Sequence, residues 1–139
     1  MDKQVIEQKL ESLRKCIKRI ETKSPQNAET LNQDMDLQDI IALNLSRAVQ
    51  LSVDIGAHII AELDSEAPET MGKTFDTLAQ AGVIAETTAL NLKKAVGFRN
   101  IAVHNYERIN WLIVHAITQK NLADFQAYTK QIHDYLEKH

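Results

Sequence analysis

A ten-residue segment, 97–106, holds the side chains of this chain that are best suited to chemistry. Arg99 is followed five positions later by His104, and Tyr106 comes two positions after that. An arginine guanidinium holds a phosphate through two parallel donors, and a histidine gives or takes a proton near neutral pH. These residue types, at this spacing, predict a site that cuts a phosphodiester bond without a metal.

The spacing of the segment sets how its side chains meet. On a regular helix Arg99 and His104 lie about 140° apart around the axis and about 7.5 Å apart along it. Asn100 and His104 are four residues apart, so the amide is placed to orient the imidazole. Either the long Arg99 side chain turns toward the histidine, or the helix ends between the two residues. Both arrangements favour an exposed groove or a subunit interface.

If the phosphodiester belongs to RNA, the substrate carries its own nucleophile, the 2′-hydroxyl, and the protein needs to supply few groups. His104 is expected to remove the 2′-hydroxyl proton or to protonate the leaving oxygen, which contributes about 10²–10⁴-fold in rate. Arg99 is expected to stabilise the charge that grows on the phosphate oxygens. One histidine does not easily act as acid and base in the same geometry. A twofold dimer would supply a second copy.

The composition limits the classes of protein to which the chain can belong. It has 139 residues, 44% of them hydrophobic, with four glycines and two prolines, which favours helices over a turn-rich β fold. A single cysteine, Cys16, excludes an internal disulfide and suits a reducing cytosol. No zinc motif, signal peptide or long apolar run is readable. We therefore expect a cytoplasmic protein with no metal, no cofactor and no membrane segment.

The charge balance restricts how the chain would bind RNA. A net charge of −3 argues against broad non-specific binding of nucleic acid, which normally needs a basic surface. An RNA-directed role must therefore depend on a local cationic groove. Lys93, Lys94, Arg99 and Arg108 are candidates to line it, although separate solvated positions explain them equally well.

Apolar residues recur at spacings of three and four along most of the chain, which predicts an all-α fold. Thr70 is a candidate N-cap, Gly82 a candidate helix terminator, and the chain is expected to start a new helix near Asn110. The expected helices cover roughly residues 3–22, 36–63 and 70–82; a fourth starts near residue 86 and leads into the motif, and one or two more follow up to the end of the chain. No repeat or linker is visible. We predict one domain, 1–139, an antiparallel bundle of five to six helices.

Three stretches resemble a known family. Residues 75–84 (F-D-T-L-A-Q-A-G-V-I) and 96–106 (V-G-F-R-N-I-A-V-H-N-Y) resemble the HepT group of HEPN proteins. Residues 54–62, ahead of a proline loop, fit the same group. An R-x4-H pattern alone occurs by chance, whereas R-N-x3-H-x-Y after the F-x2-L-x2-A-G-V-I helix end is fairly specific. The resemblance covers roughly residues 36–135.

The resemblance implies a dimeric, metal-independent endoribonuclease that is the toxin of a type VII-like HEPN/MNT toxin–antitoxin system. Arg99 and His104 would be catalytic, with Asn100 supporting the histidine. The implied substrate is RNA, with tRNA as the expected target. The implied partner is an MntA-type minimal nucleotidyltransferase, which inactivates the toxin by AMPylation of Tyr106. Assemblies larger than a dimer stay open.

Other interpretations of these residues remain at this point. The chain could be a non-catalytic helical subunit that binds nucleotide or a partner and accompanies a nucleotidyltransferase. Arg99 could be an ordinary ion-pair residue, and Tyr106 could pack its ring with the hydroxyl in water. Asp54 and His58 share a helix face, as half a metal site would, but no third ligand has a readable spacing. A structural polar pair is therefore favoured there.

Overall fold

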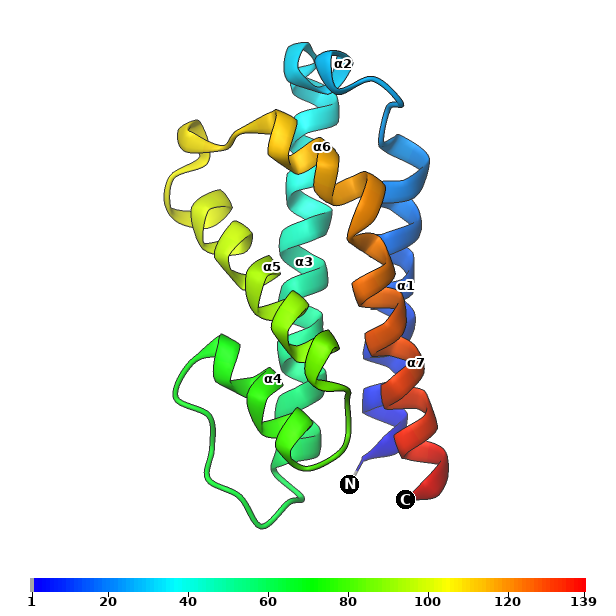
Figure 1. Cartoon of the computed structure of the whole chain (residues 1–139). Helices are drawn as coiled ribbons and strands as arrows, with labels where there is room; N and C mark the ends of the chain where they lie inside the picture. The colour runs from blue at the N-terminus through cyan, green and yellow to red at the C-terminus, as the bar shows by residue number, and fades with distance from the viewer. Residues whose placement is uncertain (1) are drawn as a thin grey trace.

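The computed structural model describes residues 2–139, and these residues form helices with no β-strand among them (Figure 1). The elements are α1 (Lys3–Lys23), α2 (Ala28–Gln33), α3 (Met35–Ile60), α4 (Met71–Gln80), α5 (Glu86–His104), the 3₁₀ turn η1 (Tyr106–Arg108), α6 (Trp111–Lys120) and α7 (Leu122–Lys138). The prediction of an all-α helical bundle is confirmed.

The described residues form seven α-helices, where five to six were expected, because they include a short helix, α2, that was not predicted. Asn27 accepts a hydrogen bond from the Glu29 N–H at 2.8 Å and caps α2. Only Leu31 of this six-residue helix is buried, so the segment has no apolar period to detect. At the other end of the chain, α6 and α7 are separate helices that meet at Asn121.

Side-chain caps and a glycine mark the helix boundaries, and the predictions for Thr70 and Gly82 are confirmed. Asp34 accepts from the Leu37 N–H at 3.1 Å at the start of α3, and Thr70 accepts from the Lys73 N–H at 3.1 Å at the start of α4. Gly82 follows α4 with a φ of 76°, a backbone conformation that residues with a Cβ rarely adopt. These local signals fix where the chain turns, and so they fix where α5 begins.

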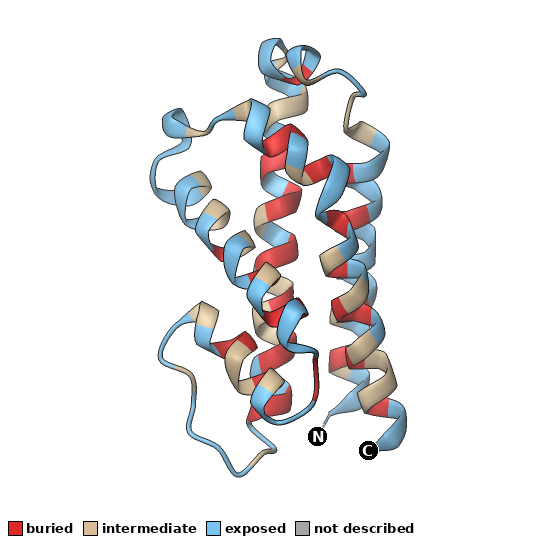
Figure 2. Ribbon diagram, in the orientation of Figure 1, coloured by how far each residue is buried: buried red, intermediate tan, exposed pale blue. Residues whose placement is uncertain are grey.

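The long helix α3 lies at the centre of the bundle and contacts α1, α2, α4 and α5. Buried residues line its length and the facing sides of α1 and α7 (Figure 2). The α4 residue Phe75 and the α7 residue Tyr128 pack edge to face with ring centroids 5.8 Å apart. The buried Tyr128 hydroxyl donates to the Ser52 carbonyl of α3 at 2.7 Å. These contacts join three helices around one core.

No uninterrupted apolar run in the sequence is long enough for a membrane span. Among the described residues, α3 alone has the length and mean hydropathy that such a span requires, and 50% of its most apolar window is buried in the bundle. Its apolar residues pack against the neighbouring helices. The central helix of a protein core meets the same criterion.

The helix that carries the motif is packed unevenly. Its N-terminal part buries Thr88, Ala89, Leu92 and Val96, whereas no residue of α5 after Val96 is buried. In Figure 1 the C-terminal end of α5 leans outward from the bundle. Ile101 and Val103 are 47% and 53% exposed. The motif is therefore presented at the surface, beside apolar side chains that this chain does not cover.

Candidate active site

Arg99 lies near the C-terminal end of α5, partly buried, and is held by a neutral side chain of α3. Its Nη2 donates to Gln50 Oε1 at 3.3 Å. Gln50 Nε2 donates to Asp54 Oδ1 at 2.9 Å, and Lys9 Nζ of α1 lies 3.9 Å from Asp54 Oδ2. No carboxylate pairs with Arg99 within the part of the chain that the structure describes. The guanidinium is thus oriented by an amide, and its charge remains available for a phosphate.

His104 is the last residue of α5 and is exposed to solvent. The Asn105 N–H bonds to the Ile101 carbonyl at 2.8 Å, so the helix continues through both motif residues. The alternative in which the helix ends between them is therefore excluded. Arg99 turns toward α3, and across residues 2–139 the imidazole of His104 has no hydrogen-bond partner. The structure does not bring Arg99 and His104 into contact within one chain.

Asn100 is exposed and shares a helix face with His104, as its spacing predicts. Among the described residues, the Asn100 amide forms no hydrogen bond with the His104 imidazole. The supporting role of Asn100 stays a prediction.

Tyr106 lies in η1 and is tied to α3 and α6. Its hydroxyl donates to Asp39 Oδ1 at 2.5 Å, and its ring packs edge to face on Trp111 with centroids 5.7 Å apart. Partial burial, then the hydrogen bond to Asp39 and the negative charge of that carboxylate, raise the pKa of Tyr106 far above its ordinary value. The phenol is therefore protonated at neutral pH.

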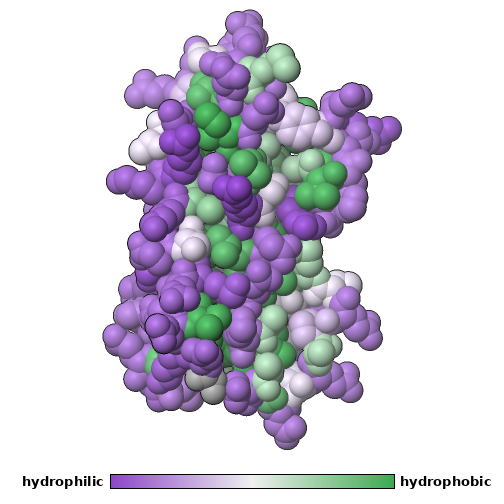
Figure 3. All heavy atoms as spheres, turned by 180° about the vertical axis from the view of Figure 1, so that it is seen from behind, coloured by the Kyte–Doolittle hydropathy of each residue, from purple (hydrophilic) through white to green (hydrophobic). Residues whose placement is uncertain are grey.

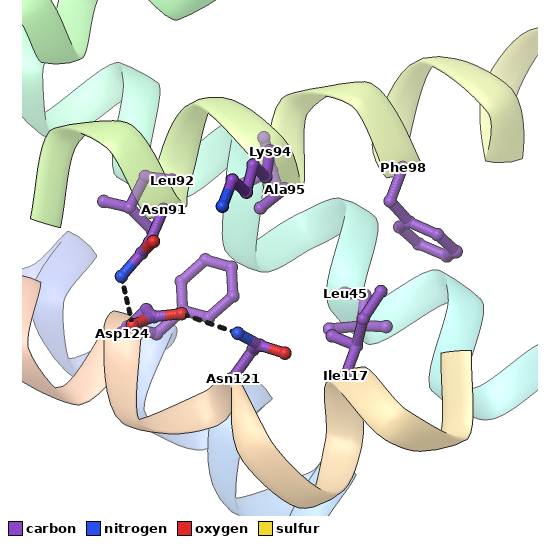
Figure 4. Close-up of a pocket in the computed structure, with 11 residues that line it drawn as sticks. Leu45, Asn91, Leu92, Lys94, Ala95, Phe98, Ile117, Asn121 and Asp124 are labelled. Carbon is purple, nitrogen blue, oxygen red and sulfur yellow. Dashed lines mark hydrogen bonds between the residues drawn. The ribbon is translucent and has the colours of Figure 1, made fainter. Parts of the chain in front are cut away.

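Two of the cations that are candidates to line one groove, Lys93 and Lys94, have different surroundings, as the alternative of separate positions allows. Lys93 Nζ pairs with Asp76 of α4 at 3.0 Å. Lys94 instead borders a cavity of about 160 Å³ between α5, α3 and the last two helices (Figure 4). At its mouth Asp124 accepts hydrogen bonds from Asn91 at 2.9 Å and Asn121 at 3.1 Å. Asn91, Asn121 and Asp124 of this cavity are thus already paired with one another.

A larger groove, of about 740 Å³, runs between α1 and α3. Three of its cations, Lys15, Arg19 and Arg47, pair with no carboxylate among the described residues. Gln50, which holds Arg99, also lines it. We call this surface the α1–α3 groove; its lining residues are Ser12, Lys15, Cys16, Arg19, Ile40, Leu43, Asn44, Arg47, Gln50, Leu51 and Asp54. Seen from behind, the molecule shows apolar patches bordered by hydrophilic side chains (Figure 3).

The predicted Asp54–His58 pair is not a contact in the structure. Asp54 bonds with Gln50 and lies near Lys9, whereas His58 is exposed on the same helix. Between residues 2 and 139 no three His, Cys, Asp or Glu side chains come together to hold a metal ion. Gln50 and Asp39, which hydrogen-bond to Arg99 and Tyr106, were not predicted from the sequence.

The chain is thus an all-α bundle that carries an arginine and a histidine near the exposed end of one helix. Residues 13–132 match the family model described as Ribonuclease HepT-like, and the chain belongs to this family. The chain is 37% identical over 124 residues to the mRNA nuclease HepT of Shewanella oneidensis, which covers 89% of this chain and 92% of that protein.

Two further relatives extend the comparison. The tRNA nuclease HepT of Aphanizomenon flos-aquae is 28% identical over 100 residues, 71% of this chain and 68% of that protein. A solved structure of a tri-AMPylated Shewanella oneidensis HEPN toxin in complex with an MNT antitoxin superposes with a TM-score of 0.87. That match has 36% identity and covers 94% of this chain and 97% of the other.

These relatives confirm the resemblance read from the motif and the class of enzyme that it implied. The family and the relatives are ribonucleases, so the interpretation as a non-catalytic binding subunit receives no support.

Proposed function

We propose that this protein is a metal-independent endoribonuclease toxin in which Arg99 and His104 cut RNA. The observation that carries the proposal is the state of the Arg99 guanidinium. It is partly buried, oriented by the neutral Gln50 at 3.3 Å, and unpaired with any carboxylate of the described chain. An arginine that served only stability would be expected to face a carboxylate. Membership in a ribonuclease family supports the same conclusion.

The chemistry follows from these two side chains. The 2′-hydroxyl oxygen attacks the adjacent phosphorus, and the bond from phosphorus to the 5′-oxygen breaks. One imidazole accepts the 2′-hydroxyl proton and another donates a proton to the 5′-oxygen. Arg99 donates hydrogen bonds to the phosphate oxygens as their negative charge grows. The products are a 2′,3′-cyclic phosphate and a 5′-hydroxyl.

A homodimer completes this site. Arg99 and His104 point in different directions from one helix, and Ile101 and Val103 leave apolar surface uncovered between them. Pairing the ends of two α5 helices would bury that surface and bring two copies of the motif together. Ile101→Glu is expected to yield monomers in light scattering and to abolish cleavage. A monomeric variant that cuts RNA normally would contradict the dimer.

RNA reaches the site along the α1–α3 groove. On α1, Lys15 and Arg19 are four residues apart and face the groove together, and Arg47 approaches from α3. Unpaired cations attract a phosphate backbone and release its counterions on binding. This local charge explains how a chain of net charge −3 binds RNA. We infer that tRNA is a substrate, although one relative is named an mRNA nuclease.

The activity is controlled by a partner of the minimal nucleotidyltransferase class, MntA-type, which places AMP on Tyr106. Tyr106 is 40% exposed and two residues past His104, so an attached nucleotide would cover the motif. Its phosphate would also repel the RNA backbone. Solved relatives pair a HEPN toxin with an MNT antitoxin, which supports this partnership. We place the protein in the cytoplasm, where RNA and nucleoside triphosphates are found.

Cleavage assays test the catalytic proposal. Wild type and His104→Ala, each shown by intact mass to be unmodified, are incubated in EDTA with a tRNA pool and with an mRNA transcript. Exposed His58 on α3 provides the matched control, His58→Ala. We expect wild type and the control to leave 2′,3′-cyclic phosphate ends, and His104→Ala to lose about 10²–10⁴-fold in rate. Cleavage by His104→Ala at the wild-type rate would overturn the assignment.

A further inference from the structure

Asp39 holds the hydroxyl that the proposed function makes the site of modification. We propose that Asp39 is the general base that accepts the Tyr106 proton when a nucleotidyl group is transferred to that hydroxyl. The inference rests on the proposed function, since it needs Tyr106 to be the acceptor. It assigns a catalytic group for the modification to the toxin itself and not to its partner alone.

The geometry of the pair fits proton transfer. The Tyr106 hydroxyl is 2.5 Å from Asp39 Oδ1, within the range of a charge-assisted O–H···O⁻ hydrogen bond. The two residues are 67 positions apart in the sequence, so the fold brings them together. Trp111 packs against the phenol ring and fixes its direction. Both Asp39 and Tyr106 remain exposed, so an active site of another protein can reach them.

The environment of Tyr106 makes a base necessary. Partial burial and the nearby carboxylate raise the pKa of the phenol, so the phenolate is scarce at neutral pH. A protonated phenol is a weak nucleophile, and an adjacent base activates such a group by removing its proton as the new bond forms. Asp39 is the only carboxylate within the described chain that bonds to this hydroxyl. The feature that keeps the phenol neutral is therefore also the group that can relieve it of its proton.

Besides the toxin itself, the step consumes only a nucleoside triphosphate. The Tyr106 oxygen bonds to the α-phosphorus of ATP, and the bond from that phosphorus to the bridging oxygen breaks with its electron pair leaving on pyrophosphate. The phenol proton passes to Asp39 Oδ1. Protonation removes the negative charge of Asp39 just as a negative phosphodiester arrives beside it. Without that transfer, the carboxylate would repel the incoming phosphate.

A purely structural role for Asp39 makes a different prediction. The hydrogen bond also ties η1 to α3, so Asp39 could serve only to position Tyr106. Asn accepts the same hydrogen bond with the same shape but does not take up a proton. Glu restores the carboxylate on a longer side chain. A base therefore distinguishes Asp39→Asn from Asp39→Glu, whereas a simple tether is kept better by Asn.

The experiment measures single-turnover transfer of radiolabelled AMP from ATP to the full-length toxin by its partner nucleotidyltransferase. Asp36, one turn earlier on α3 and exposed, gives the matched control Asp36→Asn. We expect Asp39→Asn to be modified about 10²–10⁴-fold more slowly at saturating ATP. Asp39→Glu should recover most of the rate, and Asp36→Asn should match wild type. Circular dichroism melting of each variant shows whether it is folded.

The outcomes separate the two proposals. If wild type is not labelled, or if Tyr106→Phe is labelled as fast as wild type, the proposed modification of Tyr106 fails. If wild type is labelled on Tyr106 and Asp39→Asn keeps its rate, Asp39 is not the base. Should Asp39→Asn fail to fold, Asp39→Gln and Asp39→Glu form a second matched pair. Equal rates for those two would overturn the inference.

Discussion

The two helical glycines Gly56 and Gly97 allow a test of the packing, because the same substitution should act in opposite directions. A Cβ at Gly56 of α3 would lie 2.6 Å from Thr74 Cγ2 and 3.0 Å from Leu78 Cδ1 of α4. Thr74 is buried and its β-branched side chain is stiff, so it cannot move aside easily. At Gly97 of α5, a Cβ would meet nothing within 4 Å.

The sizes follow from two opposing contributions to the free energy of unfolding. Alanine in place of glycine in a helix stabilises by about 1 kcal/mol, and overpacking a core costs about 1–3 kcal/mol. A 2.6 Å contact belongs at the upper end of that cost. We therefore expect Gly56→Ala to destabilise the protein by about 1–2 kcal/mol. Gly97→Ala keeps only the favourable contribution and should stabilise by about 0.5–1 kcal/mol.

Thermal melting followed by circular dichroism, at one fixed protein concentration, measures both variants. For a chain of this size 1 kcal/mol corresponds to about 3–4 °C in Tm. Gly56→Ala should melt about 3–8 °C below wild type, and Gly97→Ala about 2–4 °C above it. A Gly56→Ala protein at least as stable as wild type would refute the close approach of α3 and α4. Shifts of the same sign in both variants would refute the packing argument as a whole.

Three further predictions concern the site and its support. Arg99→Lys keeps the charge but loses the forked donors, so kcat/KM for RNA cleavage should fall about 10²-fold; a loss below twofold would show that the fork is dispensable. Arg47→Gln should lower the slope of log Kd against log salt by about 1, measured by anisotropy of labelled RNA; an unchanged slope would exclude Arg47 from the RNA path. Tyr128→Phe removes the hydroxyl that donates to Ser52 at 2.7 Å and should cost about 1 kcal/mol in urea unfolding, with cleavage unchanged. Full stability would mean that this buried hydrogen bond contributes nothing net.

Where one apolar stripe faces one core, the sequence predicts the fold well. Five apolar residues at spacings of three and four in the first predicted helix are all buried on α1: Ile6, Leu10, Leu13, Ile17 and Ile20. The central helix is harder because α1, α4 and α5 pack on different sides of it. Leu43 fits the apolar spacing of that helix, but its side chain is 50% exposed and lines the α1–α3 groove. A helix with several neighbours has no single buried face that a period can identify.

The candidate site divides in the same way. Arg99, His104 and Tyr106 are close in the sequence, so their residue types and spacing reveal them. The hydrogen-bond partners of Arg99 and Tyr106 come from α3. Gln50 is 49 positions away from Arg99, and Asp39 is 67 positions away from Tyr106. No local pattern links residues so far apart. Long-range pairing of this kind depends on how helices cross. For the same reason, the sequence does not show that Lys93 pairs with Asp76.

The continuity of α5 bears on the proposed dimer. Because the helix runs unbroken through Arg99 and His104, the two side chains leave it about 140° apart. The Gln50 contact then draws the guanidinium toward α3, while the imidazole stays in solvent. A phosphate held by Arg99 is thus poorly placed for the histidine of the same chain. A twofold partner would bring its own imidazole to that phosphate, so the spacing of the motif is itself an argument for cleavage across a dimer interface.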